Sequence, residues 1–208
     1  MNNKNKKELS LSGFQREILI GLILGDGHLE TQNNGRTFRL KVEHSITQKD
    51  YTDWLYEQFK DFCESGVYTK EKNNKIYVGF RTVSTGLLRF YAKQFYGNGI
   101  KMVPDKFDKF LSKTSLAIWY LDDGSRKSLN HNTYNIHSLG YTMEDLKKLQ
   151  HALEKNFSIK TTLHKQKITH WRIYIPSEST DKFTEIILPY IKMFNSMRHK
   201  IGNIEPKK

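Results

Sequence analysis

Two aspartates end two apolar segments of the chain at equivalent places. Asp26 closes the run LIGLILGDG (residues 19–27) and Asp123 closes the run LAIWYLDDG (residues 116–124), each directly before a glycine. Both runs predict short helices that are apolar almost all round, and a folded chain buries such helices at its centre. If the helices pack side by side, the two carboxylates emerge together. Paired carboxylate oxygens suit Mg²⁺ shared with phosphate oxygens, which indicates metal-assisted phosphodiester hydrolysis.

The position of these acids is unfavourable for stability. A carboxylate at the C-terminal end of a helix faces the negative end of the helix macrodipole. Asp26 and Asp123 both lie there. Because both helices place a carboxylate at this unfavourable position, the pattern indicates a functional role. One acid per helix would suit a DNA duplex, whose two strands are related by two-fold symmetry.

Glycines in the first run indicate close contact between the two helices. Gly21 and Gly25 lie one helical turn apart, and the second run has the larger residues Ile118 and Asp122 at the matching places. Because glycine costs about 1 kcal/mol in a helix interior, its use here favours the close approach of another backbone. The pattern indicates either knob-into-notch packing of the two helices or an ordinary buried helix with glycines near its end.

The predicted secondary structure repeats once along the chain. Hydrophobic periodicity and turn residues predict, in the first half, helices at 13–25, 49–63 and 85–95 and strands at 38–46, 67–71 and 75–82. The second half is predicted to contain helices at 115–123, 143–156 and 179–190 and strands at 135–138, 159–165 and 171–176. In both halves the order is helix, strand, helix, two strands, helix. This order predicts a tandem duplication with a pseudo-two-fold axis.

The charge of the chain favours a polyanionic partner. The formal net charge is +12, and a strongly basic protein gains affinity for nucleic acid through counterion release. Basic residues alternate with apolar ones in several predicted strands, which places them on one face of a sheet. The alternative is a solvated basic face. The expected contact residues are Arg36, Arg39, Lys41, Lys70, Lys72, Lys75, Arg81, Lys160, Lys165, Lys167 and Arg172.

Other classes of protein fit the sequence poorly. A single cysteine, Cys63, excludes an internal disulfide, and the eight histidines show no spacing typical of a zinc site. We find no Gly-rich phosphate loop, no apolar run of membrane-spanning length and no secretory signal. We therefore expect a soluble, intracellular protein.

The two apolar runs resemble the paired signature motifs of the LAGLIDADG homing endonucleases. The matching residues are Leu19, Gly21, Leu22, Ile23, Asp26 and Gly27 in the first run, and Leu116, Ala117, Asp123 and Gly124 in the second. The resemblance extends over essentially the whole chain. It implies an α/β (α+β) fold in which two αββαββα repeats, residues 1–112 and 113–208, form a DNA-binding saddle.

The resemblance also implies roles for individual residues. Asp26 and Asp123 would bind the catalytic Mg²⁺ (or Mn²⁺), with Asp123 favoured over its neighbour Asp122. Lys101 and Lys200, which follow these acids by 75 and 77 residues, match the basic residues near the family's active centre. Each lysine would hold the attacking water or steady the phosphoryl charge, or else contact a phosphate.

Two further positions bear on the resemblance. Gln48 matches a polar position that is common in the family after the first sheet, whereas Leu139 stands where relatives often keep a polar residue. This difference between the halves predicts unequal cutting of the two DNA strands.

The function implied is that of a monomeric, site-specific double-stranded DNA endonuclease. It would cut a long asymmetric site and promote intron mobility, in an organelle or in bacterial or phage cytoplasm. The alternatives are an intron-encoded RNA maturase and a DNA-binding protein without nuclease activity. Both acids being present argues against the loss of cleavage.

Overall fold

In the computed structural model of the chain, residues 9–128, 131–166 and 170–202 are described. The first half contains α1 (Gly13–Leu24), β1 (His28–Glu30), β2 (Arg39–Ser45), α2 (Lys49–Phe59), β3 (Tyr68–Lys72), β4 (Lys75–Arg81) and α3 (Arg89–Phe95). The second half contains α4 (Lys113–Asp123), β7 (Gly124–Ser128), β8 (His131–His137), α5 (Met143–Phe157), β9 (Thr162–Lys165), β10 (Trp171–Ile175) and α6 (Ser177–Ile191).

Short elements complete each half. A small hairpin, β5 (Tyr96–Gly97) and β6 (Ile100–Lys101), follows α3. The 3-10 turns are η1 (Ile46–Gln48), η2 (Lys60–Phe62), η3 (Gly86–Leu88), η4 (Phe107–Lys109) and η5 (Asn195–Lys200). None of the helices in the described ranges has the length and apolar character needed to cross a bilayer.

The observed order, αββαββα in each half, confirms the expected α+β fold. Two strands were absent from the expectations based on hydrophobic pattern alone. β1 has only three residues, and β7 has the polar sequence GSRKS with no apolar alternation. Pairing with the longer neighbours β2 and β8, rather than local sequence, therefore determines these strands.

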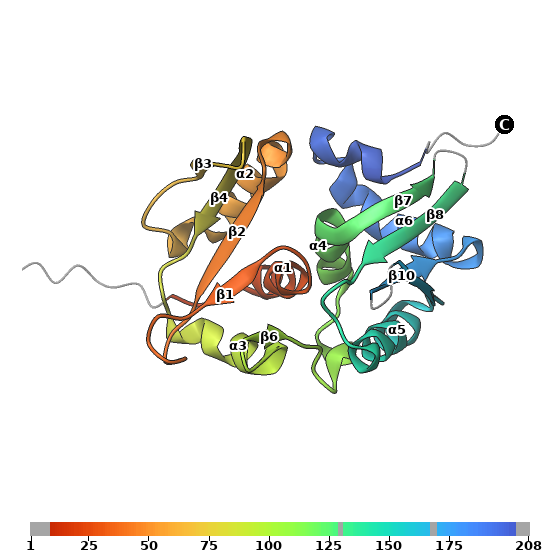
Figure 1. Cartoon of the computed structure of the whole chain (residues 1–208), viewed down its shortest axis with the longest axis horizontal. Helices are drawn as coiled ribbons and strands as arrows, with labels where there is room; N and C mark the ends of the chain where they lie inside the picture. The colour runs from red at the N-terminus through yellow and green to blue at the C-terminus, as the bar shows by residue number, and fades with distance from the viewer. Residues whose placement is uncertain (1–8, 129–130, 167–169, 203–208) are drawn as a thin grey trace, which may run out of the picture.

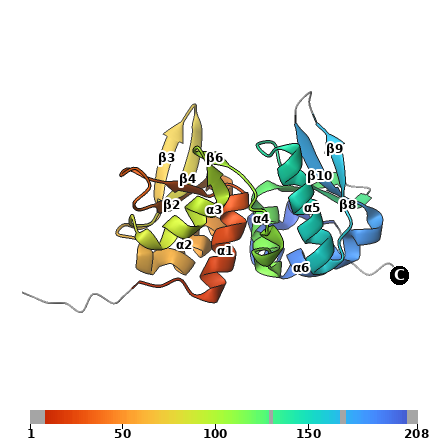
Figure 2. The same ribbon diagram turned by 90° about the horizontal axis from the view of Figure 1, so that it is seen from below.

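Each half has its own antiparallel sheet. The strand orders are β1-β2-β4-β3 and β7-β8-β10-β9, so the two sheets have the same topology. The β3–β4 turn contains Asn73 and Asn74 with φ of 52° and 59°, which is the left-handed conformation that asparagine tolerates in tight hairpins. Hairpins β3–β4 and β9–β10 project on the same side of the molecule, with α1 and α4 between the two halves (Figure 2).

Helices α1 and α4 pack side by side at the centre of the molecule (Figure 1). A Cβ built on Gly21 would lie 2.6 Å from Ile118 Cβ and 2.7 Å from the Ser115 carbonyl oxygen. A Cβ on Gly25 would lie 2.5 Å from Asp122 Cβ. The glycines are therefore the notches into which α4 fits, and the first alternative, knob-into-notch packing, is confirmed.

Capping residues fix where the helices begin. Ser12 forms a capping box with Gln15 at the start of α1, and Ser112 accepts from the Ser115 N–H at the start of α4. Thr142 caps α5 in a capping box with Asp145. Such caps satisfy N–H groups that would otherwise lack partners in the first turn.

The close contact between α1 and α4 predicts that two glycine-to-alanine substitutions in α1 differ in their effect on stability. Gly21→Ala would push α4 away and should lower the free energy of unfolding by about 1–3 kcal/mol, as overpacking does. Gly13→Ala is the matched control, because a Cβ there meets nothing within 4 Å. Urea unfolding followed by circular dichroism measures both; equal effects of the two variants would contradict the notch packing.

Candidate active site

The two acids identified from the sequence lie at the ends of the two packed helices. Asp123 is the last residue of α4, and Asp26 comes two residues after the end of α1, with its side chain 49% exposed. Burial, followed by repulsion from Asp122 and Asp26, raises the pKa of Asp123 to about 8. Burial and then Asp122 also raise the pKa of Asp26. Two neighbouring carboxyls whose ionisation is opposed by burial and by each other are suited to a bound cation.

Asp122 has a structural position between the helices. Its side chain is fully buried. Its Oδ2 accepts a hydrogen bond of 2.9 Å from the Asp26 backbone N–H, and its Oδ1 accepts one of 2.9 Å from the Tyr51 hydroxyl. Asp122 thus ties the end of α1 to α4 and to α2, and so fixes the backbone that carries Asp26.

His44 is a site residue that the sequence analysis missed. It lies on β2, where Leu40, Val42 and His44 alternate on the buried face. Its Nε2 lies 3.5 Å from Asp122 Oδ1 and 3.9 Å from Asp26 Oδ2. Within the described residues, these three side chains form a group whose ligating atoms all lie within 4.8 Å of one another. Sequence spacing between histidines could not find this group; strand alternation places His44 on the helix-facing side.

Lys101 and Lys200 reach the same helix ends from outside the helices. The Lys101 Nζ, on β6, donates to the Gly25 carbonyl oxygen at 2.5 Å. The Lys200 Nζ, at the end of η5, donates to the carbonyl oxygens of Leu121 and Asp122 at 2.5 and 3.0 Å. A cation at a helix C-terminus is favourable, so the lysines offset the dipole cost of the acids.

The electrostatics of the two lysines are similar. Burial lowers the pKa of Lys101 and of Lys200, and the nearby carboxylates oppose that shift. Sequence spacing paired each lysine with the acid of its own half. Lys101 contacts Gly25, next to Asp26, and it also lines a cavity of about 230 Å³ together with Asp123 and His137 of the other half. Lys101 therefore lies near both acids.

The first sheet carries much of the expected basic face. On β2, Arg39 and Lys41 point away from the buried side chains, and Lys70, Lys72, Lys75 and Arg81 follow on β3 and β4. This face also contains acids that the sequence analysis did not weigh. Glu30 pairs with Arg39 at 2.9 Å, and Glu43 pairs with Lys70 at 3.2 Å. The face therefore offers hydrogen-bond acceptors as well as cations.

Five of the expected contact residues need separate comment. Arg36 lies before β2, directly after a tight turn at Gly35 (φ 79°) and outside the strand predicted at 38–46. Lys160 lies before β9, although the strand was predicted at 159–165. Lys165 and Arg172 lie on β9 and β10. Lys167 lies outside the described residues.

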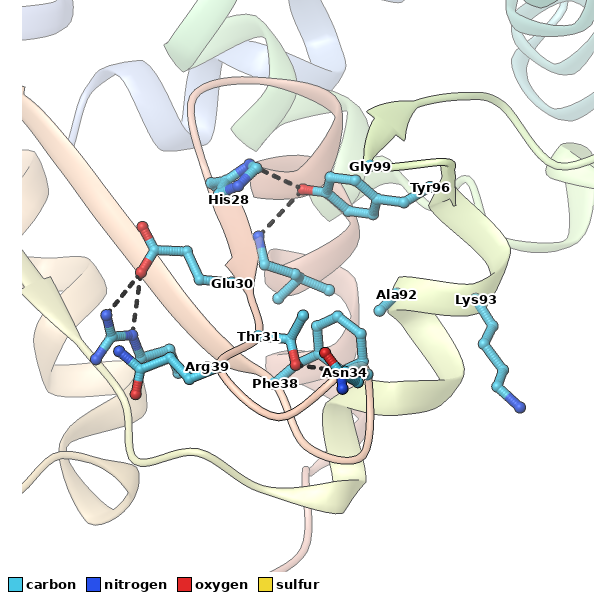
Figure 3. A pocket seen from close by; sticks show the side chains of 13 residues that line it. His28, Glu30, Thr31, Asn34, Phe38, Arg39, Ala92, Lys93, Tyr96 and Gly99 are labelled. Atoms are coloured by element: carbon cyan, nitrogen blue, oxygen red, sulfur yellow. Dashed lines mark hydrogen bonds and ion pairs between the residues drawn. The ribbon is translucent and has the colours of Figure 1, made fainter.

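A larger cavity, of about 740 Å³, lies away from the acids in the first half (Figure 3). It is bounded by the β1–β2 connection and by α3. The Tyr96 hydroxyl oxygen accepts a hydrogen bond of 3.1 Å from the Leu29 N–H, and the Tyr96 ring packs edge-on to His28. The Glu30–Arg39 ion pair forms another side.

Comparison with known proteins supports one family. The family model described as "LAGLIDADG DNA endonuclease family" matches residues 16–183. The chain is 32% identical to "DNA endonuclease I-ChuI" of Chlamydomonas applanata over 94% of this chain and 97% of that protein. It is 29% identical to "Cytochrome b mRNA maturase bI2" of Debaryomyces hansenii over 90% of this chain and 73% of that protein.

Solved structures show the same fold. The homing endonuclease I-WcaI bound to its DNA recognition sequence superposes with a TM-score of 0.85 and 24% identity, covering 98% of this chain and 96% of that one. I-DmoI in complex with DNA and Mn gives a TM-score of 0.56 and 17% identity over 86% of this chain and 98% of that one. With its two motif helices, its repeated sheets and the family match over most of its length, the chain belongs to the LAGLIDADG DNA endonuclease family.

Proposed function

We propose that the protein is a site-specific double-stranded DNA homing endonuclease. The observation that carries the proposal is the pair Asp26 and Asp123, which two packed helices place at one end of their interface between two basic sheets. One carboxylate per half matches one scissile phosphate per DNA strand. The relatives named DNA endonuclease and homing endonuclease support the same activity.

The two sheets would lie along the DNA. Antiparallel strands fit the major groove, where each base pair presents a distinct pattern of donors and acceptors. We propose residues 1–112 and 113–208 as the two repeats, each of which would contact one half-site. Since the contact residues of the repeats differ, the recognised site would be long and asymmetric, and a monomer would suffice because both acids belong to one chain.

Asp26 and Asp123 would hold the divalent ions, Mg²⁺ or Mn²⁺. The residues fit such ions, because hard carboxylate oxygens lie at the helix ends and their raised pKa values show that uncompensated negative charge is unfavourable there. When bound, the ions supply activation of water and stabilisation of the leaving oxygen. In this arrangement Asp122 and Tyr51 keep the backbone of Asp26 in place.

Lys101 and Lys200 would act beside the reacting phosphates. Their ammonium groups reach the ends of α1 and α4, and burial lowers the pKa of each below that of a surface lysine. From there, each would orient the attacking water or stabilise the phosphoryl charge. Gln48, partly buried at the end of η1, lies at the start of α2 and would contribute polar contacts nearby.

The biological consequence would be intron mobility, because a break in an intron-free allele allows the intron to be copied into it. A second candidate function is assistance in intron RNA splicing. The 29% identity to a cytochrome b mRNA maturase favours this candidate. Splicing of a candidate host intron with and without the purified protein tests it: acceleration supports a dual role, and an unchanged rate excludes it. Either role would place the protein inside a cell or organelle, where DNA and intron RNA are found.

Removal of either acid should separate cleavage from binding. Asp26→Asn and Asp123→Asn should each lower the rate of strand cleavage by about 10²-fold or more, while the DNA dissociation constant stays within a few-fold of wild type. Asp53→Asn, on the exposed side of α2, is the control and should cleave normally. A strand-resolved cleavage assay and a gel-shift assay measure the two properties. Full cleavage by Asp123→Asn would refute the assignment of this ligand.

DNA affinity should depend steeply on salt. If six or more phosphates are contacted, affinity falls roughly 10³-fold between about 50 and 200 mM salt, because counterions are released on binding. Lys72→Ala and Lys75→Ala, in the β3–β4 hairpin, should each reduce the log–log slope by about one. Lys60→Ala, which lies in η2 and pairs with Glu57, should leave the slope unchanged. A salt-independent affinity would rule out docking through the basic sheets.

The raised pKa of Asp123 predicts how stability depends on pH. Its folded pKa of about 8 exceeds the reference value of 3.8, so the contribution of this group to stability is complete below pH 3.8 and is lost as the pH rises through about 8. Ion-free Asp123→Asn should therefore melt at a higher temperature than wild type at pH 9, with the difference vanishing at low pH. Thermal melts across this range test it; a difference that does not change with pH would contradict the shift.

A further inference from the structure

We propose that His44 Nε2 is a direct ligand of the divalent ion held by Asp26, so that the metal site of the first half contains a nitrogen donor. This inference rests on the proposed binding of an ion at Asp26. The ion would lie among Asp26 Oδ2, Asp122 Oδ1 and His44 Nε2, whose atoms all fall within 4.8 Å of one another. The bound species would be a divalent ion that accepts both nitrogen and oxygen ligands, such as Mn²⁺ or Co²⁺.

The hydrogen bonds of the His44 ring determine which nitrogen is available. Its Nδ1 lies 2.9 Å from the Thr52 hydroxyl oxygen. The Thr52 hydroxyl has one hydrogen, which it donates to the Gln48 carbonyl oxygen at 3.0 Å. Thr52 must therefore accept from the His44 Nδ1–H. In the neutral ring, this leaves the lone pair on Nε2, on the side of the two carboxylates.

The surroundings of Nε2 favour a cation. The His44 side chain is 1% exposed, and Nε2 has no hydrogen-bond partner among the described residues. A nitrogen lone pair that faces carboxylate oxygens at 3.5 and 3.9 Å is repelled by them unless positive charge lies between. A shared cation removes this repulsion and also satisfies a buried polar atom, which otherwise costs stability.

The distances agree with shared coordination. Nitrogen and oxygen ligands about 2.1 Å from one ion lie about 3.0 Å apart when adjacent and about 4.2 Å apart when opposite. The observed separations of 3.5 and 3.9 Å fall between these values. Asp122 Oδ1 accepts one hydrogen bond, from the Tyr51 hydroxyl, and keeps a second lone pair for the ion.

Neighbouring residues orient the His44 ring in the way that is usual for a metal-binding histidine. Its Nδ1–H donates to the Thr52 hydroxyl, and the ring packs against Tyr51, with ring centroids 5.1 Å apart. A hydrogen bond at the second nitrogen fixes both the tautomer and the direction of a metal-binding imidazole. Both Thr52 and Tyr51 are fully buried on α2, so the ring has little freedom to turn away.

The second half has a different residue at the matching place. Counting from Gly27 and Gly124, the strand partners Lys41 and Asn135 correspond, because each pairs with the residue after the glycine. Three residues further along lie His44 and Ser138. The Ser138 hydroxyl donates to the Trp171 carbonyl oxygen. The ion at Asp123 would therefore be held differently from the ion at Asp26, and nitrogen-binding metals would prefer the first half.

The experiment uses the full-length, ion-free protein without DNA. Mn²⁺ is added to one equivalent, and pulsed electron paramagnetic resonance reads coupling of the metal to ¹⁴N. We expect histidine nitrogen coupling in wild type, its loss in His44→Asn, and its retention in His151→Asn, a change at an exposed histidine of α5. Asparagine is chosen because its amide N–H can replace the Nδ1–H bond to Thr52 while Nε2 is removed.

Affinity provides an independent measurement. His44→Asn should weaken Mn²⁺ binding by calorimetry at least about tenfold, with a smaller effect on Mg²⁺, which depends mainly on oxygen ligands. Wild type that binds Mn²⁺ without ¹⁴N coupling overturns the proposal, as does coupling that survives in His44→Asn. Because no DNA is present, nitrogen coupling in a protein that proves not to cleave DNA would support the ligand while refuting the nuclease, so the two failures are distinguishable.

Discussion

The structure depends on the close approach of α1 and α4. Gly21 and Gly25 leave no room for a Cβ where Ile118, Ser115 and Asp122 of the opposing helix pass. This contact joins the two halves and sets the separation of the helix ends. Since Asp26 and Asp123 are attached to those ends, the geometry of the acid pair is a consequence of backbone packing rather than of the loops that surround it. Small residues at the interface are therefore needed for the site as much as for the core.

Bringing acids together at the negative ends of two helices creates an electrostatic problem, and the surrounding residues address it. Lys101 and Lys200 donate to the carbonyl groups at those ends, and Tyr51 donates to Asp122. The compensation is incomplete, since the pKa values of Asp26 and Asp123 remain raised. In the proposed function, divalent cations would neutralise this remaining negative charge when the acids and the DNA phosphates meet.

Much of the architecture could be predicted from the sequence because its signals are local. Apolar runs, hydrophobic periodicity and turn residues predicted the long helices and the longer strands. What could not be predicted depends on tertiary contacts. β1 and β7 exist only through pairing with β2 and β8. Lys101 contacts Gly25 beside Asp26, as sequence spacing suggested, but it also lines the cavity at Asp123, which spacing could not show. His44 is distant from both acids in sequence, and only the fold brings it to them.

The most direct test of the central claim is cleavage of a DNA library that contains candidate intron-insertion sites. Purified protein is incubated with the library with and without Mg²⁺, and the new ends are sequenced. An endonuclease built on Asp26 and Asp123 predicts Mg²⁺-dependent breaks in both strands at one long, asymmetric site. Breaks that do not require a divalent ion would contradict the role of the acid pair. An absence of breaks despite tight binding of DNA or intron RNA would contradict the nuclease and favour a binding or splicing function.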